Sequence, residues 1–394
     1  MKNLPEESAM IHLISIIYLS FISLGLPDGL LGAGWPTMYP ELGIPVSYAG
    51  IISMIIALGT IVSSLMSDRL TYTWGAGKVT AVSVATTAAA LLGFSVTRSF
   101  WLLCLWAIPY GLGAGSVDAS LNNYVALHYS SRHMSWLHCM WGMGASIGPY
   151  IMGFVLTGGG HWSAGYRYVG LLQVALSAVL VLTLPMWKNR RTQQDHNTPE
   201  AKPLPLHQVV RIRGAREVMI TFFCYCALEQ TAMLWASSYL FLHQGLTEER
   251  AAFFASLFFM GITAGRGLNG FLTVKFNDTQ LIRMGQAIIA LGIAAMLIPL
   301  GEGLTLAGLL LIGLGCAPIY PCIIHSTPEH FGPDRSQALI GVQMASAYVG
   351  SCLAPPVFGL MANHISIGLM PFYLAAILVL MVCMHEQLIR KVEA

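Results

Sequence analysis

Long apolar stretches recur along this chain, and short polar breaks separate them. A helix that crosses a membrane needs about 20 predominantly apolar residues. Since 55% of the residues are apolar and only 10% are charged, the chain has too few charges to cover a soluble globule. We therefore predict an all-α integral membrane protein. Its twelve expected spans are residues 10–34, 46–67, 79–97, 101–126, 134–156, 166–187, 217–242, 251–273, 280–300, 303–324, 336–360 and 367–387.

The same composition excludes several classes of protein. A soluble enzyme or a disordered chain would carry far more charge. A net charge of +2 leaves no basic surface for a nucleic acid, so no nucleic-acid partner is expected. The first apolar run has no small-residue cleavage site before the next polar residue, and we interpret it as a retained span rather than a signal peptide.

One strongly polar stretch lies between the sixth and seventh spans. Residues 188–216 contain seven Lys and Arg residues and no apolar run long enough to cross a membrane. We expect an N-terminal six-helix bundle at residues 1–187, a cytoplasmic linker at 188–216 and a C-terminal six-helix bundle at 217–394.

The positive charges predict the orientation of the spans. With both termini in the cytoplasm, sixteen of the 20 Lys and Arg residues fall in cytoplasmic segments and three in outer loops. Cytoplasmic loops of membrane proteins carry such an excess of positive charge. We therefore expect a multi-pass protein with both termini in the cytoplasm.

The two predicted bundles also resemble each other in sequence. Small residues recur at nearly one offset, which indicates a duplicated six-plus-six architecture with a substrate site near the midplane. The matches are Gly59–Asp68 with Gly261–Gly270 and Gly111–Gly113 with Gly313–Gly315 at a shift of 202, Asp28 with Gln230 at the same shift, and Gly144–Gly153 with Gly350–Gly359 at a shift of 206.

The loop after the second span carries a recognisable signature. It reads Ser67-Asp68-Arg69 and then Gly75-Ala76-Gly77-Lys78, which resembles the inner-loop signature of the major facilitator superfamily. The resemblance covers nearly the whole chain and implies two pseudo-symmetric six-helix bundles that work by alternating access. It also implies a conformational latch formed by Asp68, Arg69, Lys78 and, in the second half, Arg266.

Within the superfamily, the chain most resembles the fucose:proton symporter family and related bacterial sugar permeases. Three segments carry the resemblance: Pro27–Leu31, Asp118–Asn123 and Ser135–Gly144. In the third segment His138 and Trp141 occupy positions that are Gln and Asn in that family. The resemblance implies a proton-translocating Asp118, a substrate-binding Asp28, a monomer, and a location in the bacterial cytoplasmic (inner) membrane.

Three carboxylates lie well within predicted spans: Asp28, Asp118 and Glu229. A charged group at the bilayer centre costs at least about 2.5–3.5 kcal/mol, so each needs a partner, a water-filled cavity or a proton. Burial disfavours the charged form of a carboxyl group, which lets such a group load and release a proton near neutral pH. We expect these three residues to take part in proton coupling, with Asp118 as the carrier.

Polar and aromatic side chains on the same spans suggest a sugar site. Amides and carboxylates bind paired hydroxyls, and an indole stacks on the apolar face of a pyranose. The role of His138 stays open, since its imidazole could bind a hydroxyl, relay a proton or bond a neighbouring helix. The expected substrate-binding residues are Asp28, Asn122, Asn123, Tyr124, His138, Trp141, Glu229, Gln230, Trp235, Tyr320 and Gln343.

No cofactor or metal site is expected. The eight cysteines all fall inside predicted spans without a disulfide or metal-ligand pattern, and we interpret them as free thiols. The coupling ion is expected to be the proton. Arg266 is the only cation that we expect to be buried in the bundle, so a strongly anionic substrate would lack positive charge to bind.

These observations favour a proton-coupled symporter of a neutral sugar or similar small polar solute. The alternative is a proton-driven antiporter that exports amphipathic compounds, because Gly144-x3-Gly148-Pro149 resembles a fifth-span motif of superfamily antiporters. A membrane sensor would need a soluble domain for which residues 188–216 are too short. An enzyme is not expected, because no nucleophile–base pair or metal set is present.

Overall fold

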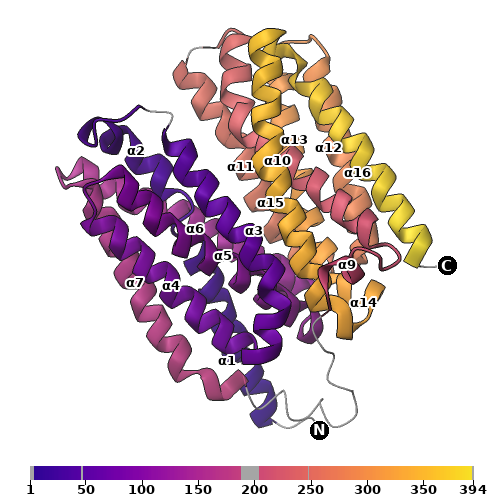
Figure 1. Cartoon of the computed structure of the whole chain (residues 1–394). Coiled ribbons are helices and arrows are strands. Elements are labelled where there is room, and N and C mark those ends of the chain that lie inside the picture. The colour runs from indigo at the N-terminus through magenta and orange to yellow at the C-terminus, as the bar shows by residue number, and fades with distance from the viewer. Residues whose placement is uncertain (1–3, 46–47, 188–203, 247, 393–394) are drawn as a thin grey trace. The chain divides into compact units, whose positions relative to one another are not determined.

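The computed structural model describes residues 4–45, 48–187, 204–246 and 248–392, and the side chains of residues 4–11, 36, 248–256 and 259 are outside this description. The described residues are helical and contain no strand, which confirms the predicted all-α fold (Figure 1). The first seven helices are α1 Leu4–Gly25, α2 Leu30–Glu41, α3 Ala49–Trp74, α4 Ala76–Val96, α5 Phe100–His128, α6 Ser131–Thr157 and α7 Trp162–Leu182.

The second half of the chain contributes a similar set. These elements are α9 Leu206–Val209, α10 Ala215–Leu242, α11 Glu248–Leu272, α12 Asp278–Leu297, α13 Glu302–His325, α14 Thr327–Phe331, α15 Pro333–His364, the 3-10 helix Ile367–Leu369 and α16 Met370–Val392. Most of the predicted linker, residues 188–203, lies outside the described residues, and its described end forms the short helix α9.

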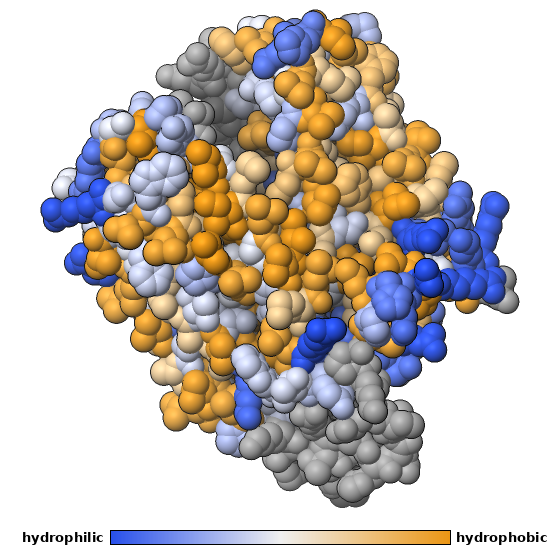
Figure 2. Space-filling model, viewed as in Figure 1, coloured by the Kyte–Doolittle hydropathy of each residue, from blue (hydrophilic) through white to orange (hydrophobic). Residues whose placement is uncertain are grey.

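Eleven stretches of the described residues are helical, long and apolar enough to cross a membrane. The first combines α1 and α2 as His12–Trp35. The remaining predicted span, residues 251–273, falls in α11, many of whose side chains are not described. Apolar residues cover most of the visible faces of the helices, and hydrophilic ones gather toward the helix ends (Figure 2). This is the surface of a multi-pass membrane protein.

The chain divides into two compact units. Unit 1 comprises Met1–Tyr124 and Leu137–Leu204, and unit 2 comprises Val125–Trp136 and Pro205–Ala394. The main boundary, between residues 204 and 205, lies within the expected linker at 188–216. One feature was not expected: the end of α5 and the beginning of α6 group with unit 2. The helices of each unit lie side by side (Figure 1).

Glycine contacts within the two units repeat the sequence duplication. A Cβ atom at Gly111 would collide with the carbonyl oxygen of Ile56, so α5 and α3 approach closely in unit 1. A Cβ atom at Gly313 would collide with the carbonyl oxygen of Phe258, which brings α13 and α11 together in unit 2 in the same way. Both members of the first pair lie 202 residues before their counterparts, which is the shift that the sequence predicts.

The glycine–proline motif of α6 has a packing role. Cβ atoms at Gly144 and Gly148 would collide with the carbonyl oxygens of Ile22 and Leu26 on the first span. The same contact recurs in unit 2, where Gly350 of α15 lies against α10. Small residues allow such close helix contacts inside a membrane, whichever direction a substrate moves.

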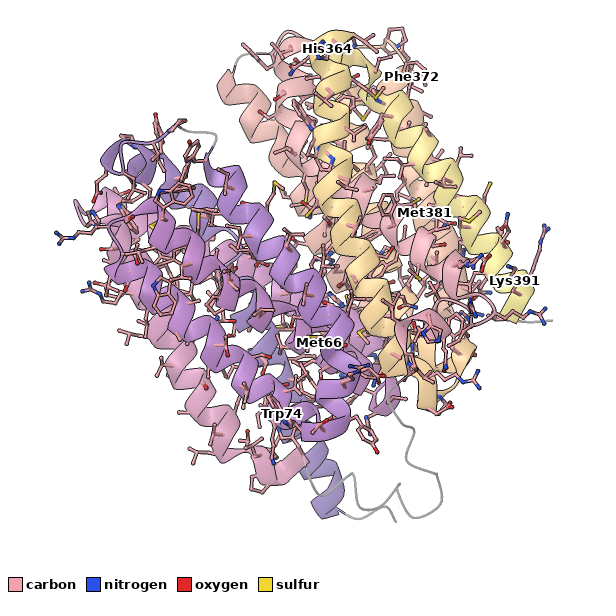
Figure 3. All side chains as sticks on the ribbon, viewed as in Figure 1. Met66, Trp74, His364, Phe372, Met381 and Lys391 are labelled. Atoms are coloured by element: carbon pink, nitrogen blue, oxygen red, sulfur yellow. The ribbon has the colours of Figure 1, made fainter. Side chains whose placement is uncertain are left out.

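Polar contacts at helix ends tie neighbouring helices together within each unit. At the end of α2, the carboxylate of Glu41 accepts hydrogen bonds from His161 Nε2 (2.7 Å) and Trp162 Nε1 (2.7 Å) at the beginning of α7. In unit 2, Lys391, labelled near the end of α16 in Figure 3, is a partner in such a contact. Its Nζ forms an ion pair of 2.7 Å with Glu217 at the beginning of α10.

Candidate functional site

The first span is broken in its middle, whereas the sequence predicts one continuous helix over residues 10–34. α1 ends at Gly25, residues 26–29 form a turn, and α2 begins at Leu30. Pro27 explains the break, because proline has no amide hydrogen and its ring clashes with the carbonyl four residues earlier. That carbonyl belongs to Ser23.

A side chain from α7 bonds the group that Pro27 leaves without its helical partner. Gln173 Nε2 donates to the carbonyl oxygen of Ser23, and Ser23 Oγ donates to Gln173 Oε1, each at 2.5 Å. Both side chains are buried, so water does not replace these bonds. Gln173 thus stabilises the break in the first span.

Asp28 lies in this turn and is the centre of the candidate site. Its carboxylate accepts hydrogen bonds from Trp141 Nε1 at 2.9 Å and from the hydroxyl of Tyr110 at 3.3 Å. Asp28 is an exposed residue, so its carboxylate is accessible. A carboxylate has about four lone-pair sites, so these two bonds leave acceptor capacity for a further ligand.

The backbone of α6 holds Trp141 in place beside the break. A Cβ atom at Gly25 would collide with the carbonyl oxygen of Trp141, so only glycine allows this approach. The close contact places the indole N–H within reach of Asp28. The structure thus brings together two of the predicted substrate-binding residues.

A second polar cluster in unit 1 surrounds Asp118, which is buried in α5. Asn122, four residues later on the same helix, donates from Nδ2 to Asp118 Oδ1 at 2.8 Å. His138 Nε2 lies 3.0 Å from Asn122 Oδ1. Because an amide oxygen only accepts, the histidine donates this bond and contacts Asp118 through Asn122. Phe21 packs edge-on against the imidazole, with ring centroids 5.5 Å apart.

Asp28 and Asp118 belong to the same unit, and their two carboxylates interact electrostatically.

The third predicted carboxylate lies in unit 2 and has a cationic partner. Glu229 in α10 is buried, and its Oε1 accepts a hydrogen bond of 3.2 Å from Arg266 Nη2 in α11. The latch role that the resemblance implies for Arg266 stays a prediction, and its guanidinium pairs with Glu229 within unit 2. A buried pair of this kind balances both charges, and removing one partner leaves the other uncompensated.

Four of the predicted substrate-binding residues bond or pack against other residues of their own unit, and their role in binding stays a prediction. Trp235 Nε1 donates to the carbonyl oxygen of Pro355 at 3.0 Å, and its ring contacts Phe358. The buried Tyr124 packs against Trp187, with ring centroids 5.1 Å apart. These interactions are those of helix packing.

The other two show the same behaviour in α13 and α15. The hydroxyl of Tyr320 donates to the sulfur of Met344 at 3.1 Å. Gln343 is fully buried and bonds the hydroxyl of Thr327. Of the remaining predicted contacts, Asn123 is buried in α5 and Gln230 is half-buried in α10.

The predicted latch residues of the first half lie near the end of α3. Asp68 is half-buried, and its Oδ2 accepts a hydrogen bond of 3.1 Å from the backbone N–H of Leu204. Arg69 and Lys78 are exposed. The described hydrogen bond of Asp68 is therefore made with the chain segment that follows residues 188–203.

Sequence reasoning missed two residues of the site, Tyr110 and Gln173. Tyr110 precedes Asp118 by eight residues on one helix, a spacing that places both near one face. Gln173 is a polar residue within an apolar span, and such residues often bond a neighbouring helix. Within the described ranges, no group of three His, Cys, Asp or Glu side chains could hold a metal ion.

Comparison with known proteins agrees with this architecture. A family model described as Major Facilitator Superfamily matches residues 17–355. The chain is 26% identical over 359 residues to an uncharacterized transporter, y4wD, of Sinorhizobium fredii, covering 86% of this chain and 89% of that protein.

Two solved structures share the fold. The fucose:proton symporter FucP of E. coli aligns with a TM-score of 0.71 and 17% identity, covering 94% of this chain and 97% of that one. The proton:xylose symporter XylE, solved with bound 6-bromo-6-deoxy-D-glucose, aligns with a TM-score of 0.79 and 12% identity, covering 96% and 95%. At these identities the likeness establishes the fold and leaves the substrate open.

Proposed function

This chain belongs to the Major Facilitator Superfamily, and from that premise we propose that it is a secondary active transporter that couples the import of a neutral sugar, or a similar small polar solute, to the entry of protons. Transport would proceed by alternating access, with the substrate site near the bilayer midplane. The bacterial relatives support a location in the inner membrane. We further propose a monomer with both termini in the cytoplasm.

The observation that carries this proposal is the accessible Asp28 carboxylate in the broken span. Broken helices form the substrate sites of many transporters, where the interruption places polar groups near the bilayer midplane. The carboxylate can accept bonds from a pair of hydroxyl groups, while the Trp141 ring offers an apolar face. These are the two surfaces that a pyranose presents to a protein.

The charge of this site supports a neutral substrate. Asp28 receives two uncharged donors, and the guanidinium of Arg266 in unit 2 is paired with Glu229. An anionic substrate would have to approach an uncompensated carboxylate. A neutral polyol avoids that repulsion and can donate to the carboxylate.

Asp118 is our candidate for the proton carrier. It is buried, and Asn122 holds its carboxylate in one orientation. Protonation of Asp118 would remove its repulsion of Asp28 and so favour the binding of substrate there. Glu229 is a further candidate, since protonation would release Arg266 from the pair. We assign His138 a positioning role, because its ring bonds Asn122, which in turn bonds the Asp118 carboxylate.

A ligand screen of the purified full chain tests the substrate class. Fucose, xylose and 6-bromo-6-deoxy-D-glucose serve as the probes, and a binding sugar raises the thermal unfolding midpoint by mass action. If amphipathic cations stabilise the protein and none of the sugars does, the sugar proposal is wrong and the exporter alternative replaces it.

Coupling is tested in vesicles with a sugar that binds. Adding it to right-side-out vesicles should alkalinise the medium, because protons enter with the substrate. Asp118→Asn should abolish accumulation against a gradient but retain exchange. Asp334→Asn, the same change at an exposed position of α15, is the matched control and should retain both. Accumulation by Asp118→Asn would show that the proton is carried elsewhere.

A further inference from the structure

The turn between α5 and α6 packs within unit 2. We call residues Val125–Trp136 the hairpin tip; they group with unit 2, while the remainder of α5 and α6 belongs to unit 1. The tip therefore joins the two units by chain continuity. Its docking can change only if its contacts with unit 2 break.

Packing holds one end of the hairpin tip. A Cβ atom at Gly270 of α11 would collide with the indole of Trp136, so the ring lies directly on the helix backbone. The same indole contacts Phe271 edge-on at 5.9 Å. Next to it, Asn269 Nδ2 donates to Ser135 Oγ at 2.7 Å.

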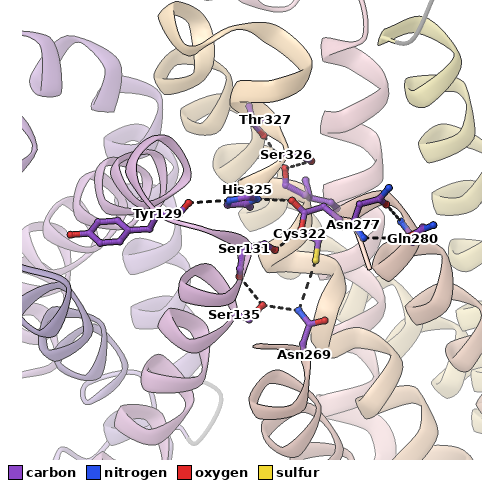
Figure 4. Close-up of polar contacts among 12 residues, drawn as sticks. Tyr129, Ser131, Ser135, Asn269, Asn277, Gln280, Cys322, His325, Ser326 and Thr327 are labelled. Carbon is purple, nitrogen blue, oxygen red and sulfur yellow. Dashed lines mark hydrogen bonds and ion pairs between the residues drawn. The ribbon is translucent and has the colours of Figure 1, made fainter. Parts of the chain in front are cut away.

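A polar cluster holds the other end (Figure 4). His325 Nδ1 lies 2.6 Å from Asp278 Oδ2, and His325 Nε2 lies 3.1 Å from the carbonyl oxygen of Tyr129. Ser131 Oγ donates to Asp278 Oδ1. The side chains of His325 and Asp278 are 21% and 10% exposed, so the cluster is shielded but protons can reach it.

The docked cluster requires one additional proton. Each ring nitrogen of His325 faces an oxygen, one on the Tyr129 carbonyl and one on the Asp278 carboxylate. A neutral imidazole carries a single N–H and a carboxylate carries none, so they could form only one of the two bonds. Forming both requires an imidazolium beside a carboxylate, or a neutral imidazole beside a protonated carboxyl group.

The helix ends favour the charged arrangement. Asp278 is the first residue of α12, after the Asn277 cap, where the helix dipole stabilises a negative charge. His325 is the last residue of α13, where the dipole stabilises a positive charge. Both terminal positions therefore support an ion pair.

Two titratable groups act on this pair, and others lie on the adjoining elements. Glu329 on α14 acts on His325 electrostatically, and the thiol of Cys322 on α13 lies near Asp278. The remaining such groups on the adjoining elements are Tyr129, His128, Arg132 and His133 on the hairpin tip, Lys275 before α12, Arg283 on α12 and His330 on α14.

We propose that His325 and Asp278 form a proton-binding latch that holds the hairpin tip in unit 2 and releases it when the proton leaves. Only the role of the latch rests on the proposed function, and that role is to control rocking of the two bundles from the predicted cytoplasmic side. The step is a proton transfer alone: docking takes one proton from the aqueous phase, and release returns it. This proton site is separate from Asp118.

Hydrogen–deuterium exchange of the full chain in lipid nanodiscs tests the latch without any substrate. Exchange in the hairpin tip is measured between pH 6 and pH 8.5 and corrected for intrinsic rates. Because docking binds one proton, the opening equilibrium should increase by up to about tenfold per pH unit. His325→Gln, whose side chain does not titrate, should remove this dependence on pH.

Two further variants separate the latch from general destabilisation. Ser131→Ala removes one bond to the tip but no titratable group, so it should raise exchange at every pH and keep the pH dependence. Glu386→Gln breaks the exposed Arg283 pair on α12 and should leave the tip unchanged. A flat pH response in the wild type, or an unchanged response in His325→Gln, overturns the proposal. If exchange in the tip depends on pH but transport is not coupled to protons, the latch is supported and the proposed function is wrong.

Discussion

Replacing Gln173 with Leu should destabilise unit 1 at the break in the first span. The substitution keeps a buried side chain of similar size but removes both hydrogen bonds to Ser23. The hydroxyl of Ser23 can turn to a carbonyl of its own helix. The Ser23 carbonyl has no such alternative, because Pro27 supplies no N–H.

The expected loss follows from that single unsatisfied group. A buried polar group without a partner costs about 1–3 kcal/mol. Hydrogen bonds between membrane helices contribute about 0.6 kcal/mol on average. We therefore expect Gln173→Leu to lower the free energy of unfolding by about 2 kcal/mol. This value lies between the cost of losing one hydrogen bond between membrane helices and the cost of a fully unsatisfied carbonyl.

A double-mutant cycle with Pro27→Ala tests the mechanism. Alanine restores the N–H that can bond the Ser23 carbonyl within the helix, so Gln173→Leu should cost at least about 1 kcal/mol less in the Pro27→Ala background. Reversible unfolding of the purified protein gives the four free energies. Gln286→Leu in α12 is the matched control, because its amide nitrogen has no hydrogen-bond partner among the described residues. Equal losses in both backgrounds would refute the proposed role of Gln173.

Three further predictions concern Glu229, Gly148 and Glu41. Glu229→Gln should lower the free energy of unfolding by roughly 3–5 kcal/mol, since it leaves Arg266 buried without its counter-charge. Adding Arg266→Met should recover most of the loss, and a double variant as unstable as Glu229→Gln would contradict the pairing. Gly148→Leu should abolish folded protein on size-exclusion chromatography, because its side chain meets the backbone of the first span, whereas Gly153→Leu has open space and should be tolerated. Burial of Glu41 favours the neutral form of its carboxyl group, but the hydrogen bonds from His161 and Trp162 outweigh it and hold the pKa of Glu41 below its usual 4.5. The folded protein should therefore lose stability as the pH falls below that value. Glu41→Gln should weaken that acid sensitivity in thermal unfolding, and an unaltered acid response would exclude the contribution.

Helix periodicity predicted part of the candidate site. Asp118 and Asn122 are one turn apart on a single helix, so their contact follows from the sequence once that helix is recognised. The three intramembrane carboxylates were found because each is costly in an apolar span. Trp235, Tyr124, Tyr320 and Gln343 were chosen for their chemistry, and their role in binding stays a prediction.

Contacts between distant helices were not predictable in this way. Gln173 lies 150 residues from Ser23, and nothing in the local pattern pairs the two. The same holds for Glu229 with Arg266, which are 37 residues apart. Each pair depends on which helices are neighbours and on how each helix is rotated.

The apolar runs and the repeated glycines determined the helices and their duplication, since a bilayer requires long apolar helices with internally satisfied backbones. Only the tertiary structure decided which buried polar groups share a partner. Side chains on different helices meet only when those helices pack, and the free energy of each buried charge depends on that neighbour. The sequence by itself therefore established a transporter fold, and helix packing gave Asp28, Arg266 and His325 their individual surroundings.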